Sequence, residues 1–132
     1  MSRLTFTNLP VKDLEKSKEF YSQLGFEFNE DFTGENAACL VISESSFSML
    51  MTESLFQMST NKEIADATKT TEVVVALSAD SREEVDEIVD KALNAGSSEP
   101  VPTEDQPWMY CRTFEDPDGH VWQLFHMSQG DE

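Results

Sequence analysis

The chain has 132 residues, of which 39% are hydrophobic and 27% are charged, a composition typical of a single globular domain and not of a disordered chain. Nine Lys and Arg residues stand against 26 Asp and Glu residues, and the resulting net charge of −17 argues against binding to nucleic acid or to an anionic membrane surface. The sequence has no long apolar run and no signal-peptide pattern at its start, so it predicts a cytoplasmic protein.

The first half of the chain predicts a strand, a helix and then three further strands. Asp13 is a suitable N-cap for the helix and Gly25 a suitable end, and between them Leu14, Ser17, Tyr21 and Leu24 recur at helical spacing. The expected strands cover residues 4–11, 26–29, 37–43 and 47–52, with turns at 31–36 and 44–46.

The second half repeats this order after a polar connector at 59–70, which has room for a short helix around 62–67. Ser81 followed by Glu84 is a capping-box pattern, and Gly96 ends the helix. The expected strands cover residues 72–77, 108–114 and 120–127, with a loop at 97–107 and a turn at 115–119.

The repeated order predicts an α+β fold with two βαβββ modules, paired into one curved, cup-like mixed sheet with the helices outside. We expect a single domain over residues 1–132, with module 1 at about 1–58, the connector at about 59–70 and module 2 at about 71–128. Cys39 and Cys111 fall in comparable strands, where we expect buried and reduced thiols.

Two motifs near opposite ends of the chain carry a family resemblance. Residues 11–26 fit the pattern V-x-D-L-x-x-S-x-x-F-Y-x-x-L-G-F, and Asp116-Pro117-Asp118-Gly119 precedes the last expected strand. Together with the repeat, the chain resembles the glyoxalase/bleomycin-resistance/extradiol-dioxygenase superfamily, which has the vicinal oxygen chelate fold, and within it small bacterial glyoxalase-like proteins described as predicted lactoylglutathione lyases. The motif residues themselves build a helix and a turn and have no expected catalytic role.

The resemblance implies a cup in which four strands supply ligands to a divalent metal that acts as a Lewis acid. The first-strand position falls at Phe6, which cannot bind a metal; Asn8, on the same strand face, offers only a weak carbonyl ligand. Residues 47–52 contain no carboxylate or imidazole, so the expected metal ligands are Glu72 and Gln123. Such a site would suit Mn, Ni, Fe, Zn or Mg, or would hold no metal if it has degenerated.

Glu72 has three open interpretations: a metal ligand, a general base in a metal-free pocket, or a solvated residue at the start of a strand. The candidate substrate-binding residues are Phe6, Asn8, Trp108 and Arg112. Arg112 could donate hydrogen bonds to a substrate carboxylate or could form a salt bridge within the chain. We expect His120 and His126 to be isolated surface residues, with His126 on the strand face opposite Gln123.

A soft and aromatic set of side chains supplies the core and a possible pocket lining: Met49, Met51, Trp108, Met109, Tyr110 and Trp122. Two functions follow from the resemblance. One is a metal-dependent lyase, isomerase or dioxygenase that acts on a small oxygenated substrate. The other is a metal-free protein that binds and sequesters a drug or metabolite, as bleomycin-resistance proteins do. The resemblance also implies a homodimer.

Overall fold

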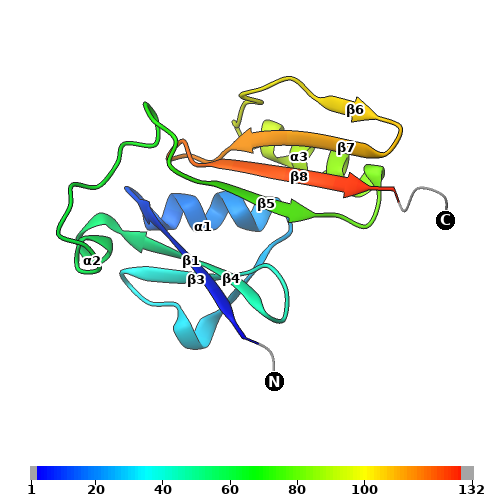
Figure 1. The fold of residues 1–132 in the computed structure, drawn as a ribbon. Coiled ribbons are helices and arrows are strands. Elements are labelled where there is room, and N and C mark those ends of the chain that lie inside the picture. Colours follow the sequence, from blue (N-terminus) through cyan, green and yellow to red (C-terminus); the bar gives the residue numbers. More distant parts are fainter. Residues whose placement is uncertain (1–2, 129–132) are drawn as a thin grey trace. The chain divides into compact units, whose positions relative to one another are not determined.

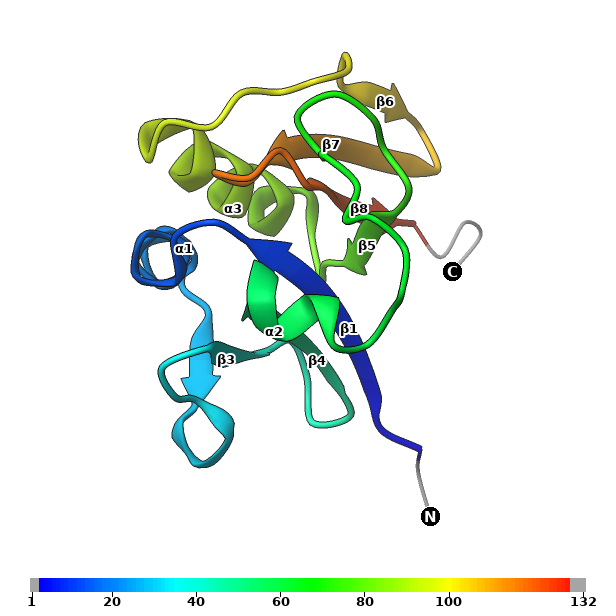
Figure 2. The same ribbon diagram turned by 90° about the vertical axis from the view of Figure 1, so that its left-hand side faces the viewer.

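A computed structural model describes residues 3–128 and divides the chain into two compact units, residues 1–65 and residues 66–132 (Figures 1 and 2). We call them the first and second unit and describe each by itself. None of the helices within residues 3–128 is long and apolar enough to cross a membrane.

The first unit is a four-stranded sheet with one long helix. Its elements are β1 (Thr5–Val11), α1 (Leu14–Gln23), β2 (Glu27–Asn29), the 3-10 helix η1 (Glu30–Phe32), β3 (Ala37–Val41), β4 (Ser46–Thr52) and α2 (Glu53–Gln57). The strand order is β1-β4-β3-β2, in which β1 and β4 are parallel and the other pairs are antiparallel.

Helix α1 begins and ends as the sequence predicts. The Asp13 carboxylate accepts a hydrogen bond from the backbone N–H of Lys16, so it satisfies one of the free donors of the first turn. Gly25 follows the helix with a φ of 101°, a conformation that favours glycine. The helix packs against β3 and β4, where the side chains of Leu40 and Leu50 are fully buried.

The second unit repeats this plan. Its elements are β5 (Val74–Ser78), α3 (Arg82–Asn94), β6 (Glu104–Gln106), β7 (Met109–Glu115) and β8 (Val121–Met127). The strand order is β5-β8-β7-β6, with β5 and β8 parallel and the other pairs antiparallel. Figure 1 shows α3 along one face of this sheet, and Val85, Val89 and Ala92 of the helix are fully buried.

The two βαβββ modules of the α+β fold are therefore confirmed. Cys39 and Cys111 lie in corresponding strands, β3 and β7, and both are buried as expected. The hydrogen-bonded strands form two four-stranded sheets, one in each unit. That residues 1–132 act as one domain, with a connector at about 59–70, stays a prediction.

Several local expectations were wrong. Residues 62–67 form no helix; instead, the Asp66 carboxylate accepts hydrogen bonds from the N–H and the hydroxyl of Thr68, which stabilises a turn. The expected loop at 97–107 contains strand β6, an edge strand whose three polar residues are exposed and so show no hydrophobic alternation. His120 is buried, with 8% exposure, and is not a surface residue.

The capping box of α3 forms with a shifted partner. The Ser81 hydroxyl accepts from the backbone N–H of Glu84 at 3.1 Å, as expected. The Glu84 carboxylate, however, accepts from the backbone N–H of Asp80 at 2.7 Å, one residue before the N-cap. The helix start is thereby tied to the end of β5.

Candidate functional site

Each sheet has one face packed against its helix, and we call the opposite face the open face. In the first unit, Leu9, Leu40 and Leu50 point toward the helix, and their neighbours along each strand therefore point to the open face. The open-face residues of β1 and β4 are Phe6, Asn8, Pro10, Phe47, Met49 and Met51.

The open face of the first unit is lined by aromatic and methionine side chains. Phe6 lies directly opposite Phe47 across the parallel pair β1 and β4, and the two rings stack with centroids 5.0 Å apart and an interplanar angle of 17°. Phe6 is 45% exposed, and Phe47 is half-buried. Met49 and Met51 extend the apolar surface along β4, and the exposed Asn8 pairs with Met49 at its side. This surface can bind an apolar or aromatic molecule.

The open face of the second unit is more polar. Thr113 of β7 pairs with Gln123 of β8, and Gln123 pairs in turn with Ala76 of β5. Thr113 is 4% exposed, and its hydroxyl oxygen is buried without a hydrogen-bond partner within the described part of the chain. This arrangement leaves a buried hydroxyl that is unsatisfied beside the Gln123 amide.

Cys111 lies on the same face, two residues before Thr113. Burial raises the pKa of the Cys111 thiol, and the nearby Glu104 carboxylate raises this pKa further, while a hydrogen bond with Gln123 acts in the opposite direction. Burial likewise raises the pKa of Cys39. Both thiols are therefore protonated at neutral pH, and neither is an activated nucleophile.

The residues of these faces do not fit a chelated metal ion. On the four strands that carry the ligands of related folds, the open-face side chains of the described chain that offer an amide oxygen are Asn8 and Gln123, and neither is charged. Across residues 3–128, no group of three or more His, Cys, Asp and Glu side chains is arranged to hold a metal ion.

Glu72 and Gln123, the expected metal ligands, are not brought together as strand partners. β5 begins at Val74, so Glu72 lies two residues before the strand, and its side chain is exposed. The open-face residues of β5 itself are Val74, Ala76 and Ser78. The position of Glu72 corresponds to the third interpretation of the sequence, a solvated residue near a strand start, and its metal-binding and catalytic roles stay predictions.

Arg112 points to the helix side of its sheet. Its guanidinium donates to Asp86 at 2.8 Å and to Asp90 at 3.1 Å, both on α3, and also to Glu99. The Tyr110 hydroxyl donates to the same Asp86 carboxylate at 2.6 Å. The alternative interpretation of Arg112, a salt bridge within the chain, is the arrangement that the structure contains.

The other predicted residues divide between the units. Phe6 and Asn8 share the open face of the first unit, as their spacing predicts. Trp108, in the turn between β6 and β7, is 52% exposed. The sequence analysis did not identify Phe47 or Thr113 as site residues, because strand register decides which side chains meet across a sheet. For Phe47, the one available signal was an aromatic residue in a strand that could pair with the first strand.

Comparison with known proteins shows what the chain is similar to. A family model described as "Bleomycin resistance protein-like N-terminal" matches residues 3–43. A search of curated protein sequences finds no match to the chain.

Solved structures with the same fold match nearly the whole chain. A hypothetical protein from S. aureus is 29% identical over 96% of this chain and 94% of its own, with a TM-score of 0.78. A glyoxalase/bleomycin resistance protein/dioxygenase from Nocardioides is 25% identical over 100% of this chain and 87% of its own, with a TM-score of 0.72. An antibiotic-binding protein from Streptomyces sp. CB03234 is 22% identical over 97% of this chain and 98% of its own, with a TM-score of 0.66.

The fold defines a protein of the vicinal oxygen chelate type, with one βαβββ module in each half of the chain. Residues 3–43 are similar to the bleomycin resistance protein-like N-terminal family, and the whole chain shares its fold with solved structures of glyoxalase/bleomycin resistance/dioxygenase proteins.

Proposed function

We propose that this protein binds a small apolar or aromatic molecule without a metal ion, in the manner of the drug-binding members of its superfamily. The observation that carries the proposal is the open face of the first unit, where the Phe6–Phe47 stack and the two methionines provide an apolar surface. Asn8 beside this surface supplies an amide that can donate to or accept from a polar group of the ligand.

The ligand-binding alternative is favoured over metal-dependent chemistry by the residue types of the open faces. Lewis-acid catalysis requires several charged or imidazole ligands around an open coordination position. At the corresponding strands this chain has Phe6, Phe47 and Ala76, side chains that cannot bind a metal. Activity as a lyase, isomerase or dioxygenase therefore stays a prediction, and we assign no catalytic residues to it.

Two comparisons support the binding function. The family model that matches residues 3–43 describes the part of the chain that contains β1, α1 and β3, and its description names bleomycin resistance proteins. One structural relative is an antibiotic-binding protein. A homodimer and a cytoplasmic location stay predictions that sedimentation and cell fractionation would test.

The test is a thermal-shift screen of aromatic antibiotics, cationic glycopeptides included, carried out in EDTA. Because a ligand that binds only the folded state stabilises it by about 2.7 kcal/mol at 100 times its Kd, a true ligand raises the melting temperature by several degrees. We expect at least one compound to do so, and we expect Phe47→Ala to abolish most of the shift because it removes half of the aromatic stack.

Phe32→Ala is the matched control, since Phe32 is a 61% exposed phenylalanine of η1 that makes no part of the Phe6–Phe47 stack. It should leave the shift unchanged. The proposal is wrong if every stabilising compound requires an added divalent metal, if Phe32→Ala and Phe47→Ala weaken binding equally, or if no compound of the panel stabilises the protein.

A further inference from the structure

A pocket of about 430 Å³ lies at the carboxyl ends of the parallel strands β5 and β8, on residues of the second unit alone. Its lining consists of Ser78, Ala79, Asp80, Phe125, His126 and Met127. A volume of this size lies within the range of small-molecule sites. The Phe6–Phe47 surface has no residue in it, so the pocket is separate from the function proposed above.

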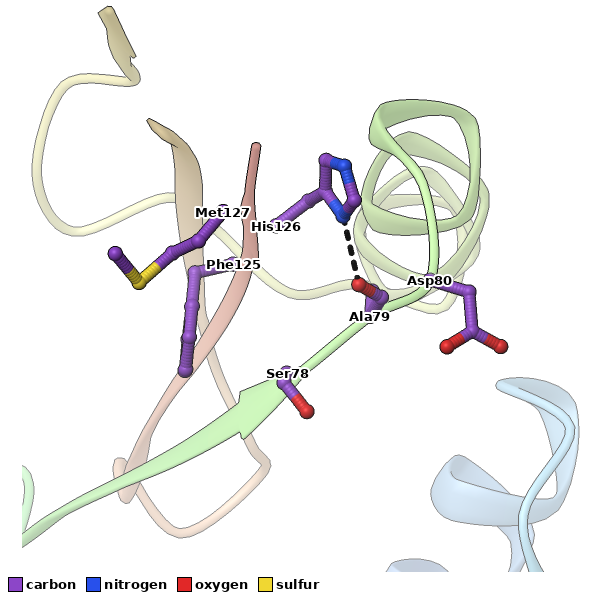
Figure 3. Close-up of a pocket in the computed structure, with 6 residues that line it drawn as sticks. All are labelled: Ser78, Ala79, Asp80, Phe125, His126 and Met127. Atoms are coloured by element: carbon purple, nitrogen blue, oxygen red, sulfur yellow. Dashed lines mark hydrogen bonds between the residues drawn. The ribbon is translucent and has the colours of Figure 1, made fainter. Parts of the chain in front are cut away.

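Two hydrogen bonds, one through the N–H and one through the carbonyl oxygen of Ala79, hold the backbone at the pocket. The N–H of Ala79 donates to the carbonyl oxygen of Phe125 at 2.7 Å. The carbonyl oxygen of Ala79 lies 2.9 Å from Nδ1 of His126 and, as a carbonyl, can only accept, so Nδ1 carries the hydrogen (Figure 3). These two bonds fix the end of β5 against β8, so the lining residues keep their places.

The side chains of the pocket combine an apolar wall with a carboxylate. Figure 3 shows Phe125 and Met127 on one side of β8 and His126 on the other, with the Asp80 carboxylate beyond the end of β5. Met127 is 49% exposed and Phe125 is half-buried, so both present apolar surface to a ligand. A phenyl ring and a thioether attract an organic cation through the ring face and through polarisable contact.

Asp80 is available to balance the charge of such a ligand. Its exposed carboxylate forms no ion pair with a Lys or Arg among residues 3–128, whereas Arg82, two residues further on, is paired with Asp105. The second unit contains 16 acidic residues and four basic ones, so the surrounding field repels anions and attracts cations. A metal ion is a poor fit, because one carboxylate and one His, whose Nδ1 is already bonded, give too few ligands.

We propose that this pocket binds an organic cation, a protonated or quaternary amine with an apolar body, whose charge faces Asp80 and whose apolar part lies against Phe125 and Met127. The proposal does not depend on the function proposed for the open face of the first unit, since the two sites share no residue.

Benzyltrimethylammonium is a suitable probe, and phenylacetate, an aromatic anion of similar size, is its control. Both are titrated into isotope-labelled protein while the Met127 methyl and the His126 ring are followed by NMR. We expect saturable shifts with the cation and none with the anion. Asp80→Asn keeps the size of the side chain and removes its charge, and we expect it to weaken cation binding about three- to fivefold.

Glu115→Gln is the matched control, since it removes one charge at Glu115 of β7, which pairs with Val121 at the opposite end of β8 from Met127. It should change cation affinity much less than Asp80→Asn. The proposal is overturned if phenylacetate binds as well as the cation, if the two variants weaken binding equally, or if the cation gives no saturable shift at these residues. Phe47→Ala should leave the cation titration unchanged, so failure at this pocket is distinct from failure at the open face of the first unit.

Discussion

Gly119 lets the Asp-Pro-Asp-Gly turn lie against the backbone of Ala67 and Thr68. Its φ is 89°, and a Cβ atom at this position would lie 2.8 Å from the carbonyl oxygen of Ala67 and 2.9 Å from its carbonyl carbon. Neither backbone atom can move aside without disturbing the chain, so both the conformation and the close approach require glycine.

We therefore expect Gly119→Ala to lower the free energy of unfolding by about 2–3 kcal/mol, measured by urea denaturation. Gly34→Ala is the control, because a Cβ atom there meets nothing within 4 Å and the residue is not in the left-handed region. That variant should be as stable as the wild type or slightly more stable. Equal stability of the two variants would contradict the close approach at Gly119.

Thr113 contains a buried hydroxyl whose oxygen has no hydrogen-bond partner within residues 3–128. Thr113→Val replaces it with a methyl group of nearly the same shape, which removes the desolvation cost of an unsatisfied polar group. We expect the variant to gain about 1 kcal/mol of stability in urea denaturation. Thr113→Ser, which keeps the hydroxyl, should show no gain. A loss of stability in Thr113→Val would mean that the hydroxyl is satisfied in solution.

For single residues, the sequence predicts a structural role correctly where that role depends on neighbours close along the chain. The caps at Asp13 and Ser81 and the turn at Gly119 were predicted correctly, because each depends on residues within four positions along the chain. The unsatisfied hydroxyl of Thr113 depends on neighbours in other strands, so no local pattern could identify it.

Arg112 connects three elements of the second unit: it lies on β7, and its guanidinium binds Asp86 and Asp90 of α3 and Glu99 of the following loop. The hydrogen bond with Glu99 is the largest influence that raises the pKa of Arg112, with smaller contributions from Asp86 and Asp90 against the effect of burial. The Arg112 side chain is only 10% exposed, so the carboxylates would repel one another if the guanidinium were removed.

Arg112→Met should therefore cost about 2 kcal/mol of stability at pH 7, less than a fully buried pair because the acids are partly exposed. Lys91→Met, which breaks only the exposed pair with Glu87, should cost less than about 0.5 kcal/mol. The comparison is made by urea denaturation, and similar losses in both variants would show that the Arg112 network contributes little.

The same network predicts a dependence on pH. Burial raises the pKa of Asp86, but the hydrogen bonds from Tyr110 and Arg112 outweigh it, and the folded pKa lies below the ordinary value. A lowered folded pKa adds stability that is complete above the unfolded pKa of about 3.9 and is lost as the pH falls through the folded value. The difference between the wild type and Arg112→Met should thus shrink below about pH 4, and a difference that grows in acid would contradict the assignment.

Elements with a hydrophobic pattern were predicted well, and elements without one were not. The helices and the strands with an apolar side follow from periodicity, as at α1 and α3. Strand β6 has three exposed polar residues and forms only because β7 offers an edge to pair with. The five-residue helix α2 is likewise too short to show a period.

At the scale of the whole chain, the repeat and the two motifs were enough to predict the fold, which is confirmed, and a superfamily resemblance that the family model supports over residues 3–43. The site could be predicted only in part. Strand alternation correctly placed Phe6 with Asn8, and His126 on the face opposite Gln123. Which face of β7 packs on α3 is decided by tertiary contacts, and this is why the ion pairs of Arg112 could be considered but not assigned from the sequence.

The measurement that tests the central claim most directly is the divalent metal content of the purified protein, determined by elemental analysis after dialysis against Mn, Ni, Fe, Zn or Mg. Because the open-face residues of β1, β4, β5 and β8 include no charged side chain, we expect far less than one ion per chain, and no difference between the wild type and the variants Glu72→Ala and Gln123→Ala. About one ion per chain that is lost in both variants would contradict the account and make the protein a metalloprotein.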